Sequence, residues 1–439
     1  MYRMKSVLIL LVVLGLFQCA DQTQERVVSP LELLFHPDNG DLVLPDGFKA
    51  VVVADSVGSA RHMVVRENGD IYVALRRQKE GGGIAALRDT NQDGRADMVK
   101  YFGDTAGTGI EIFAGNLYFS SNTAVYRIPL DEDLIPSGKV ETVVKGFPDQ
   151  QSHAAKSFTI DEHGNLYVNV GAPSNACMEN SRTQGSVGMN PCPQLEWQAG
   201  IWVFDATEIN QHHRKKGYHY ATGIRNAVAI DWNEESDALY VVQHGRDQLN
   251  TLWPEYYSDE DNANIPSEDF FLVRDGSNFG WPYTYYDGLK KQRMLAPEYG
   301  GDGVTPADPG QYEDPIMAFP AHWAPNDLIF YNHSQFPERY RNGAFIAFHG
   351  SWNRAPQPQA GYNITFVTMD PTLPNGPYEI FADGFPGVDN FTSPSDAKSR
   401  PTGLAVGPDG SLYVSDSVKG KIWRILYVGS SMEHASDSL

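Results

Sequence analysis

Six stretches of the chain repeat one short pattern, a turn that contains Gly, Asn or Asp followed by a strand of aliphatic and aromatic residues. The copies lie at residues 68–73, 116–119, 163–168, 237–241, 342–346 and 409–414. Two copies also have an upstream strand, at 157–161 and 403–407, and each such pair predicts a β-hairpin. An irregular β-sandwich would not need the same hairpin six times. The repeat therefore predicts an all-β chain folded as a six-bladed β-propeller.

Composition and spacing agree with this fold. The 439 residues include 41 Gly and 28 Pro, too many for a helical protein, and 12% are aromatic, which favours strands. The fourth and fifth copies of the repeat are far apart in the sequence. A blade cannot hold so long a segment, so we expect long loop insertions on one face of the propeller. We expect residues 253–341 to set substrate specificity; the alternative is that they only cover a blade edge.

The net charge limits the possible partners. The formal charge is −21, from 34 Lys and Arg against 55 Asp and Glu. Such a charge argues against nucleic acid and against an anionic membrane surface as partners. It suits a soluble protein outside the cytoplasm.

The first residues are typical of a bacterial export signal. Arg3 and Lys5 precede an apolar run at 7–17, which is too short to span a bilayer, and Cys19 follows. Residues 16–19 resemble a lipoprotein cleavage box, so we expect a signal peptide at 1–18 and lipidation of Cys19, with ordinary signal cleavage as the alternative. We further expect a tether at 19–44, the propeller at 45–428 and a polar tail at 429–439. The protein would then be periplasmic or held at the outer face of a membrane, touching it only through the lipid.

Two further cysteines, Cys177 and Cys192, lie in a stretch rich in Gly, Asn and Pro. In an exported chain, one remaining pair of cysteines indicates a disulfide. Two unpaired buried thiols are the alternative.

Polar residues lie where several of the predicted strands begin or end. His153 comes just before the hairpin of the third blade, and Arg225 and Asn226 lie in the corresponding place before the fourth. A histidine at such a position is a candidate general base, although a plain surface position is the alternative for any one of twelve histidines. An Arg–Asn pair suits a carboxylate or an oxyanion. The turn at 243–247 contains Gly245 and exposes backbone carbonyls suited to a hard cation.

A second polar set follows the fifth copy of the repeat. Residues 348–354 place Trp352, Asn353 and Arg354 in one turn, and Arg400 precedes the last strand pair. Arg pairs with carboxylates, Trp stacks on planar groups, and Asn gives directed hydrogen bonds. These residues suit a planar anionic ligand held at the centre of the propeller.

The loop 89–97 has the first part of a calcium-binding pattern. Oxygen-bearing side chains recur at Asp89, Asn91, Asp93 and Asp97, and Gly94 permits a sharp turn. The glutamate that usually completes the pattern is missing. We therefore expect a shorter, structural Ca²⁺ site, with an Asx-rich turn as the alternative.

Taken together, these features resemble the glucose/sorbosone dehydrogenase family, quinoprotein aldose and sugar dehydrogenases that use pyrroloquinoline quinone (PQQ). The resemblance covers residues 45–428 and rests on the six hairpins and on the segments 223–226, 244–247, 324–325, 348–354 and 400–403. The turn at 348–354 is especially similar to the sorbosone and pyranose dehydrogenase branch. The sequence has no G-x-S-x-G, P-loop, G-x-G-x-x-G or C-x-x-C-H motif that would indicate another chemistry.

The resemblance implies a mechanism and a set of residue roles. PQQ, a flat tricarboxylate quinone, would lie at the top of the central channel beside Ca²⁺, which polarises its reactive carbonyl. His153 would remove the proton of the sugar hydroxyl as hydride passes to the quinone, and Arg225 would stabilise charge on the quinone oxygen. The carbonyls of Gly245 and Arg246 would bind the Ca²⁺. Cofactor contacts are expected from Asn226, His244, His322, Trp352, Asn353, Arg354 and Arg400.

The chain departs from the soluble glucose dehydrogenases of this family at three positions. Their base is oriented by an Asp whose position here is Ala172, so another group, such as Asn175, must orient His153. Val228 and His244 each replace a Gln. The favoured function is a PQQ-dependent dehydrogenase of a sugar or related aldehyde, with a separate electron acceptor such as a periplasmic carrier or a quinone. A Ca²⁺-dependent propeller hydrolase of the lactonase kind and a binding-only propeller with a degenerate site are the alternatives.

Overall fold

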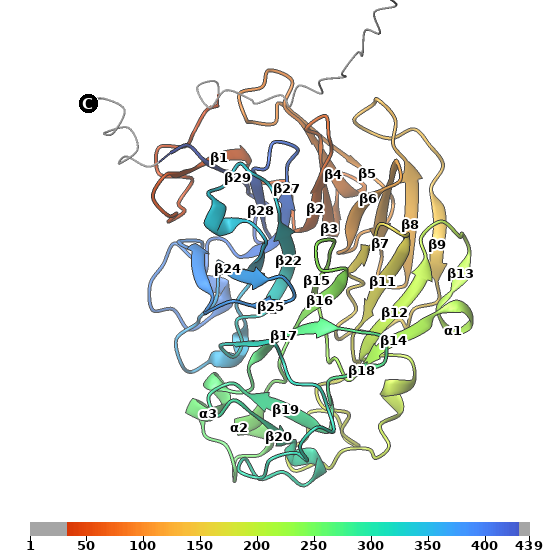
Figure 1. The fold of residues 1–439 in the computed structure, drawn as a ribbon, viewed down its shortest axis with the longest axis vertical. Helices are drawn as coiled ribbons and strands as arrows, with labels where there is room; N and C mark the ends of the chain where they lie inside the picture. Colours follow the sequence, from red (N-terminus) through yellow and green to blue (C-terminus); the bar gives the residue numbers. More distant parts are fainter. Residues whose placement is uncertain (1–32, 430–439) are drawn as a thin grey trace, which may run out of the picture.

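The computed structural model describes residues 33–429, which form a ring of six β-sheets around a central channel (Figure 1). This is the predicted six-bladed propeller. The first strand of each blade lies at the channel, and neighbouring first strands contact one another around the ring. These inner strands are β2 (Ala60–Val65), β6 (Ile110–Phe113), β10 (Phe158–Ile160), β15 (Ala229–Asn233), β22 (Pro325–Tyr331) and β27 (Pro401–Val406).

The repeated pattern of the sequence forms the second strand of every blade. These strands are β3 (Ile71–Lys79), β7 (Asn116–Ser120), β11 (Asn165–Val170), β16 (Ala238–Gln243), β23 (Gly343–Phe348) and β28 (Leu412–Asp416). Each pairs antiparallel with the inner strand before it. Their side chains are mostly buried, because both faces of each sheet are covered by the neighbouring blades.

The outer strands complete the blades. They are β4 (Gly82–Arg88) and β5 (Met98–Phe102), β8 (Ala124–Pro129) and β9 (Glu141–Lys145), β12 (Gly200–Asp205) and β14 (Tyr218–Thr222), β17 (Glu268–Val273) and β21 (Met317–Phe319), β24 (Asn363–Asp370) and β26 (Glu379–Ala382), and β29 (Ile422–Tyr427). Short strands β13 (Gln211–His212), β18 (Ser277–Asn278) and β25 (Leu373–Pro374) extend three of the sheets. In the last blade, β1 (Phe48–Ala54) pairs antiparallel with β29, so the two ends of the described chain close the ring together.

Aromatic side chains fill the space between the last two blades. Phe48 on β1 meets the rings of Phe336, Tyr340 and Phe381 edge to face, with centroid distances of 4.8, 5.4 and 5.0 Å. Edge-to-face pairs add to the free energy gained from burial of the rings. The high aromatic content noted in the sequence is therefore used to join blades.

The segment before β1 packs on the propeller. The expected tether extended to residue 44, but from residue 33 onward the chain lies against blade 6. Leu33 and Leu42 are buried, and the indole of Trp423 donates to the carbonyl of Gly40 at 2.9 Å. These contacts join residues that are nearly the whole chain apart, so local composition does not reveal them. The polar composition of 33–44 therefore suggested a tether.

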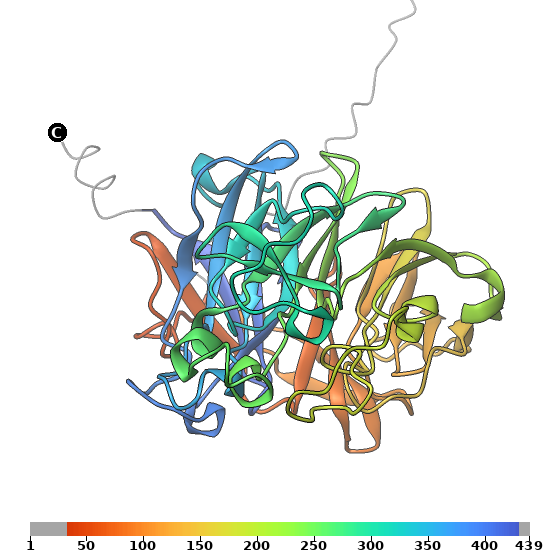
Figure 2. The same ribbon diagram turned by 90° about the horizontal axis from the view of Figure 1, so that it is seen from below.

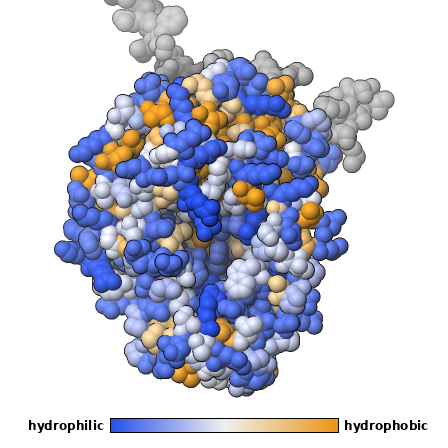
Figure 3. Space-filling view, turned by 180° about the vertical axis from the view of Figure 1, so that it is seen from behind, coloured by the Kyte–Doolittle hydropathy of each residue, from blue (hydrophilic) through white to orange (hydrophobic). Residues whose placement is uncertain are grey.

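All inner strands begin on one side of the ring, which we call the loop face. The long insertion forms α2 (Leu249–Leu252), α3 (Asp259–Asn264) and the hairpin of β19 (Thr284–Asp287) and β20 (Gln292–Leu295). Its two short helices lie at this face, on the lower side of Figure 2. The one-turn α1 (His213–Lys216) lies on the outer side of blade 3. Seen directly, the loop face is hollowed near its middle and largely hydrophilic (Figure 3).

A disulfide braces a second loop on this face. Cys177 and Cys192 are bonded, as the sequence predicted, and close the loop 177–192. Met178 of this loop packs with Leu249 and Trp253 of the insertion. The two segments therefore form one wall beside the channel.

The predicted signal peptide, Cys19 and all but the first residue of the predicted tail lie outside the described residues. Between residues 33 and 429, no helix is long and apolar enough to span a membrane.

Candidate active site

His153 lies on the loop face, just before β10, in a left-handed backbone conformation with φ of 51°. Its Nδ1 donates to the carbonyl oxygen of Ala172 at 2.6 Å, which leaves Nε2 as the acceptor nitrogen. Burial and the nearby Arg225 lower the pKa of His153 to about 3. The imidazole is therefore neutral at physiological pH, as a general base must be.

The group that orients His153 differs from the expectation. Asn175 was the candidate, but its Oδ1 accepts from Arg225 Nη2 at 3.0 Å and from the Asp247 amide at 2.9 Å. The main-chain carbonyl of Ala172 orients the imidazole instead. A backbone carbonyl is common to every residue, so this contact could not be recognised from the side chain at position 172.

Gly171 allows this close arrangement. A Cβ at this position would lie 2.5 Å from Asn226 Oδ1 and 2.7 Å from the Cβ of His153. Real Cβ atoms do not approach other atoms so closely, so only glycine lets the end of β11 meet both side chains. Asn226 Oδ1 also accepts from Asn169 Nδ2 at 3.2 Å, and this bond holds the amide in place.

Arg225 is fixed by a buried ion pair. It is 2% exposed, and its Nη2 lies 2.9 Å from the Asp247 carboxylate, which also pairs with Arg182 of the disulfide loop at 3.0 Å. Arg225 and the neighbouring cations lower the pKa of Asp247 to about 2, against the opposing effect of burial. The positive charge of Arg225 is therefore balanced within the protein.

The turn after β16 contains backbone carbonyls without a hydrogen-bond partner in the described residues. Within residues 33–429, the carbonyls of Gly245 and Arg246 accept no hydrogen bond, which leaves both available to a hard cation. The Arg246 side chain pairs instead with buried Glu298. His244 Nε2 donates to the carbonyl of Pro325 at 2.7 Å, and this bond joins blades 4 and 5.

Glu268 supports this turn and was not identified from the sequence. It is 2% exposed, and its two oxygens accept from the amides of Gly245 at 2.9 Å and Ala324 at 3.1 Å. Burial raises its pKa to about 8. A carboxylate on an outer strand gives no sequence signal, because only the fold brings the two amides to it.

The residues predicted at 348–354 have mixed surroundings. Asn353 is buried and contacts His322 Nε2 at 3.1 Å, and its Oδ1 accepts from the Gln248 amide at 3.1 Å. Arg354 Nη1 donates to the carbonyl of Ala263 at 2.6 Å. Asn353, His322 and Arg354 thus attach the insertion to the propeller, whereas Trp352 is 51% exposed.

Arg400 lies on the other side of the channel from His153. Its guanidinium donates to the carbonyls of His349 at 3.0 Å and Gly350 at 2.6 Å. It lines a hollow of about 380 Å³ together with His349, Arg61, Arg76 and Arg77. We call these five residues the cationic pocket.

Blade 1 contributes three arginines to the cationic pocket that the sequence analysis did not select. Arg61 begins β2, and Arg76 and Arg77 lie on β3. Burial, with Arg76 and Arg400 nearby, lowers the pKa of Arg61 to about 10. The sequence does contain a signal that could have identified Arg76 and Arg77. They are consecutive arginines directly after the apolar part of the first repeat, and the other site residues also lie at strand ends on this face.

His244 links the two sides of the site. Burial lowers the pKa of His244 to about 4, and the charges of Arg225 and Arg61 add to this effect. Arginines from blades 4 and 1 therefore both act on His244. Burial likewise keeps the pKa of His349 well below its usual value, with Arg400 and Arg61 beside it. The fold thus collects neutral histidines and cations from four blades around one opening.

The loop 89–97 lies outside this site, at the turn between β4 and β5. Asp89 accepts from the amides of Gln92 and Gly94, both at 2.7 Å, and Asp97 accepts from Thr90. Its carboxylates are not among the described residues whose ligand atoms gather within 4.8 Å. The loop thus forms an Asx-rich turn, and the structural Ca²⁺ site stays a prediction.

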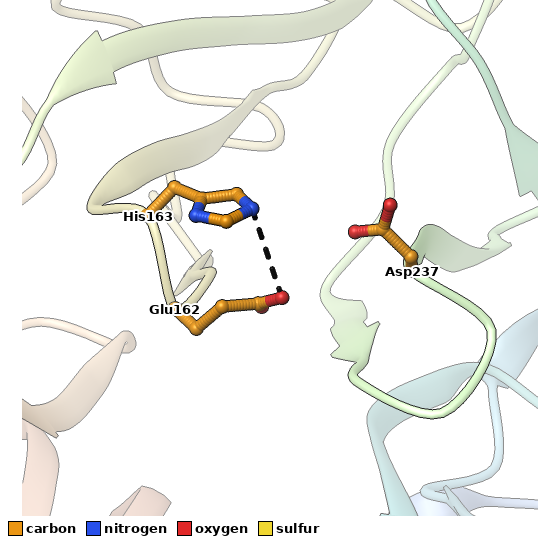
Figure 4. Close-up of side chains that lie close together, drawn as sticks. All are labelled: Glu162, His163 and Asp237. Carbon is orange, nitrogen blue, oxygen red and sulfur yellow. Dashed lines mark ion pairs between the residues drawn. The ribbon is translucent and has the colours of Figure 1, made fainter.

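One group of potential metal ligands does gather among residues 33–429, on the opposite face. Glu162, His163 and Asp237 come from the hairpin turns of blades 3 and 4, with ligand atoms within 4.8 Å of one another (Figure 4). All three are exposed, and Glu162 also accepts from the indole of Trp232 at 3.1 Å. We assign them no part in the reaction, because they lie at the far side of the ring.

The far half of the channel is lined by acids. A hollow of about 360 Å³ there contains Glu111, Asp231 and Asp327 from three inner strands. Burial raises the pKa of all three. They accept from amides of the next inner strand, at Ile160 (3.3 Å), Phe330 (2.9 Å) and Leu404 (2.7 Å).

Comparison with known proteins agrees with the resemblance drawn from the sequence. The chain is 24% identical over 412 residues to an uncharacterised protein of Borreliella burgdorferi, covering 91% of this chain and 95% of that protein. It is 26% identical over 289 residues to the pyrroloquinoline quinone-dependent pyranose dehydrogenase of Coprinopsis cinerea. That match covers 56% of this chain and 37% of the relative.

Solved structures support the fold. The PQQ domain of the Coprinopsis cinerea pyranose dehydrogenase superimposes with a TM-score of 0.68 at 19% identity, covering 88% of this chain and 97% of that domain. The relatives do not favour the lactonase or the binding-only alternative. The family model described as TrAA12-like matches residues 42–427. The chain therefore belongs to the TrAA12-like family.

Proposed function

We propose that the protein is a PQQ-dependent dehydrogenase that oxidises a sugar or a related aldehyde. The observation that carries this proposal is His153, a neutral imidazole with its Nδ1 proton fixed on a backbone carbonyl and its Nε2 free to accept. It lies beside Arg225 and across the channel from the cationic pocket. A general base next to a cationic site for a planar anion is what sugar oxidation by a quinone requires.

The residues present fit both PQQ and the Ca²⁺ ion that would accompany it. Arg61 and Arg400 line the cationic pocket and form no ion pair within the described chain, so their charge is available to carboxylates of a flat tricarboxylate. The free carbonyls of Gly245 and Arg246 suit Ca²⁺, which prefers oxygen ligands. When bound, PQQ would supply the two-electron acceptor, and Ca²⁺ would supply Lewis acidity beside it.

The chain's own groups supply the proton chemistry. Nε2 of His153 accepts the proton of the sugar hydroxyl, and the resulting imidazolium is stabilised because Nδ1–H already donates to Ala172. Arg225 contributes fixed positive charge where negative charge develops, and Asp247 with Asn175 holds its guanidinium in one orientation. These groups need no rearrangement before the reaction.

Electrons would leave to a separate acceptor, because the sequence has no C-x-x-C-H haem motif. A periplasmic carrier or a membrane quinone would serve. Export by residues 1–18 and a lipid on Cys19 would hold the enzyme at a membrane surface near either acceptor.

Reconstitution tests the proposal directly. Purified protein is incubated with PQQ and Ca²⁺, and quinone absorbance and dye reduction are followed on a panel of aldoses, sugar acids and aldehydes. We expect bound quinone and substrate-dependent dye reduction. Quinone binding without any turnover would favour a binding-only propeller, and no quinone binding would reject the proposal.

A further inference from the structure

The arginine charges of the cationic pocket are not neutralised by ion pairs within the described residues. Four of the residues that line it are arginines, and no Asp or Glu lines it. None of the four forms an ion pair among residues 33–429, although Arg88, Arg127, Arg225, Arg246, Arg293 and Arg424 each do. The nearby Asp416 carboxylate instead accepts amides, those of Arg400, Val418, Lys419 and Gly420. In a chain with a net charge of −21, such a gathering of unpaired cations indicates an anionic ligand.

The arginines lie at two depths. Arg61 and Arg400 are only partly exposed and are held by Thr108 and by backbone carbonyls. Arg76 and Arg77 are exposed at the rim, and their side chains make no hydrogen bond within the described chain. Their backbone is nevertheless fixed, because both amides donate to Ser59, at 2.8 and 3.1 Å. The rim thus has a rigid base with free guanidinium groups.

A bound tricarboxylate would not use all of this charge. Its carboxylates would be bound by the inner pair, Arg61 and Arg400, which leaves both rim arginines uncommitted. Ca²⁺ on the carbonyls of Gly245 and Arg246 would add further positive charge, and Arg354 also lacks a carboxylate partner. The loaded site would therefore remain positive toward solvent, where the substrate must enter.

We propose that the substrate is an acidic sugar, a hexuronate or a related aldose acid, whose carboxylate binds Arg76 and Arg77 at the rim. This inference rests on the proposed function and names its substrate class. Guanidinium groups bind carboxylates through two parallel hydrogen bonds, which orients the sugar as well as attracting it. A carboxylate held at the rim leaves the other end of the sugar, with its anomeric hydroxyl, directed into the site.

The first test compares matched substrates on the enzyme loaded with PQQ and Ca²⁺. D-Glucuronate is compared with D-glucose, and D-galacturonate with D-galactose, by dye reduction. We expect kcat/KM to be at least about 10-fold higher for each uronate, because only the acid forms charge-assisted hydrogen bonds with the rim arginines. The advantage should shrink as ionic strength rises. Equal kcat/KM values for acid and neutral sugar would overturn the inference.

A binding measurement separates recognition from turnover. The methyl glycoside of D-galacturonate has no free anomeric hydroxyl, and its affinity for the loaded protein is compared with that of methyl D-galactoside by calorimetry. We expect the acid to bind at least about 10-fold more tightly. Arg76→Gln with Arg77→Gln should remove this difference and lower the uronate-to-aldose ratio of kcat/KM, while Lys215→Gln, which removes an exposed cation on α1, should change neither.

The outcomes distinguish this inference from the proposed function. If PQQ does not bind the wild-type protein, the proposed function fails. If PQQ binds and aldoses are oxidised without preference for acids, only the substrate class is wrong. If Arg76→Gln with Arg77→Gln weakens PQQ binding as strongly as it weakens uronate binding, the rim arginines belong to the cofactor site and the inference is overturned.

Discussion

The two ends of the central channel are lined by opposite kinds of ionisable side chain, and the protein uses the two sets differently. At the loop face, Arg61, Arg76, Arg77 and Arg400 form no ion pair with a carboxylate of the described residues 33–429. At the other end, Glu111, Asp231 and Asp327 each accept an amide of the next inner strand. The acids thus join blades, whereas the arginines remain available. Charge that the protein has already satisfied serves the fold, and unsatisfied charge marks where a ligand binds.

This comparison predicts two classes of variant. Changes at the loop face should alter binding and turnover with little effect on stability. Changes at the acidic end should alter stability with little effect on binding. A loop-face variant that mainly lowers stability, or an acidic-end variant that mainly lowers binding, would contradict this comparison.

The largest effect is expected at His153. His153→Gln removes the acceptor nitrogen, so kcat should fall by about 10²–10⁴-fold, the usual contribution of a general base. Quinone absorbance should persist, because no carboxylate contact is lost. Steady-state dye reduction and the absorbance spectrum measure the two quantities. His163→Gln, on the opposite face, is the matched control and should retain full turnover; comparable losses in both variants would argue against a base at position 153.

The next effect is expected at Glu268. Glu268→Ala leaves the amides of Gly245 and Ala324 without acceptors, so the cation-binding turn loses its support. Affinity for Ca²⁺ should fall by about 10–100-fold, as is usual when a group that orients metal ligands is removed. Terbium luminescence or calorimetry measures it, with the exposed Glu379→Gln as control. Unchanged affinity would mean that the carbonyls of Gly245 and Arg246 are not the cation ligands.

The smallest effect is expected at the acidic end. Burial raises the pKa of Asp231 to about 7, so its protonated form favours folding at low pH and this contribution is lost as pH rises through about 7. Asp231→Asn retains an oxygen for the Phe330 amide and cannot ionise. The variant should therefore be more stable than wild type at pH 8, by roughly 2 kcal/mol, and similar at pH 4. Urea unfolding at both pH values tests this. A variant less stable at pH 8 would contradict the assignment, as would a loss of quinone binding.

Part of the site was predictable because a repeated sequence pattern shows where the strands begin and end. Once six hairpins are recognised, His153, Arg225 and Arg400 all precede inner strands and must face the same side. Arg76 and Arg77 lie toward the end of a second strand, β3, and so face the same side, although they were not selected. The Asp89–Asp97 pattern stays a prediction as a metal site, because the same oxygens that bind Ca²⁺ can also accept from the amides of a tight turn.

The sequence by itself determined the propeller, its disulfide and the face that carries the polar strand ends, because these follow from local periodicity and from spacing along the chain. Only the tertiary structure decided which charges are balanced. Asp247 balances Arg225 across two loops, a backbone carbonyl orients His153, and no carboxylate of residues 33–429 forms an ion pair with Arg61 or Arg400. Such pairing depends on distances between blades remote in sequence, and local patterns contain no information about those distances.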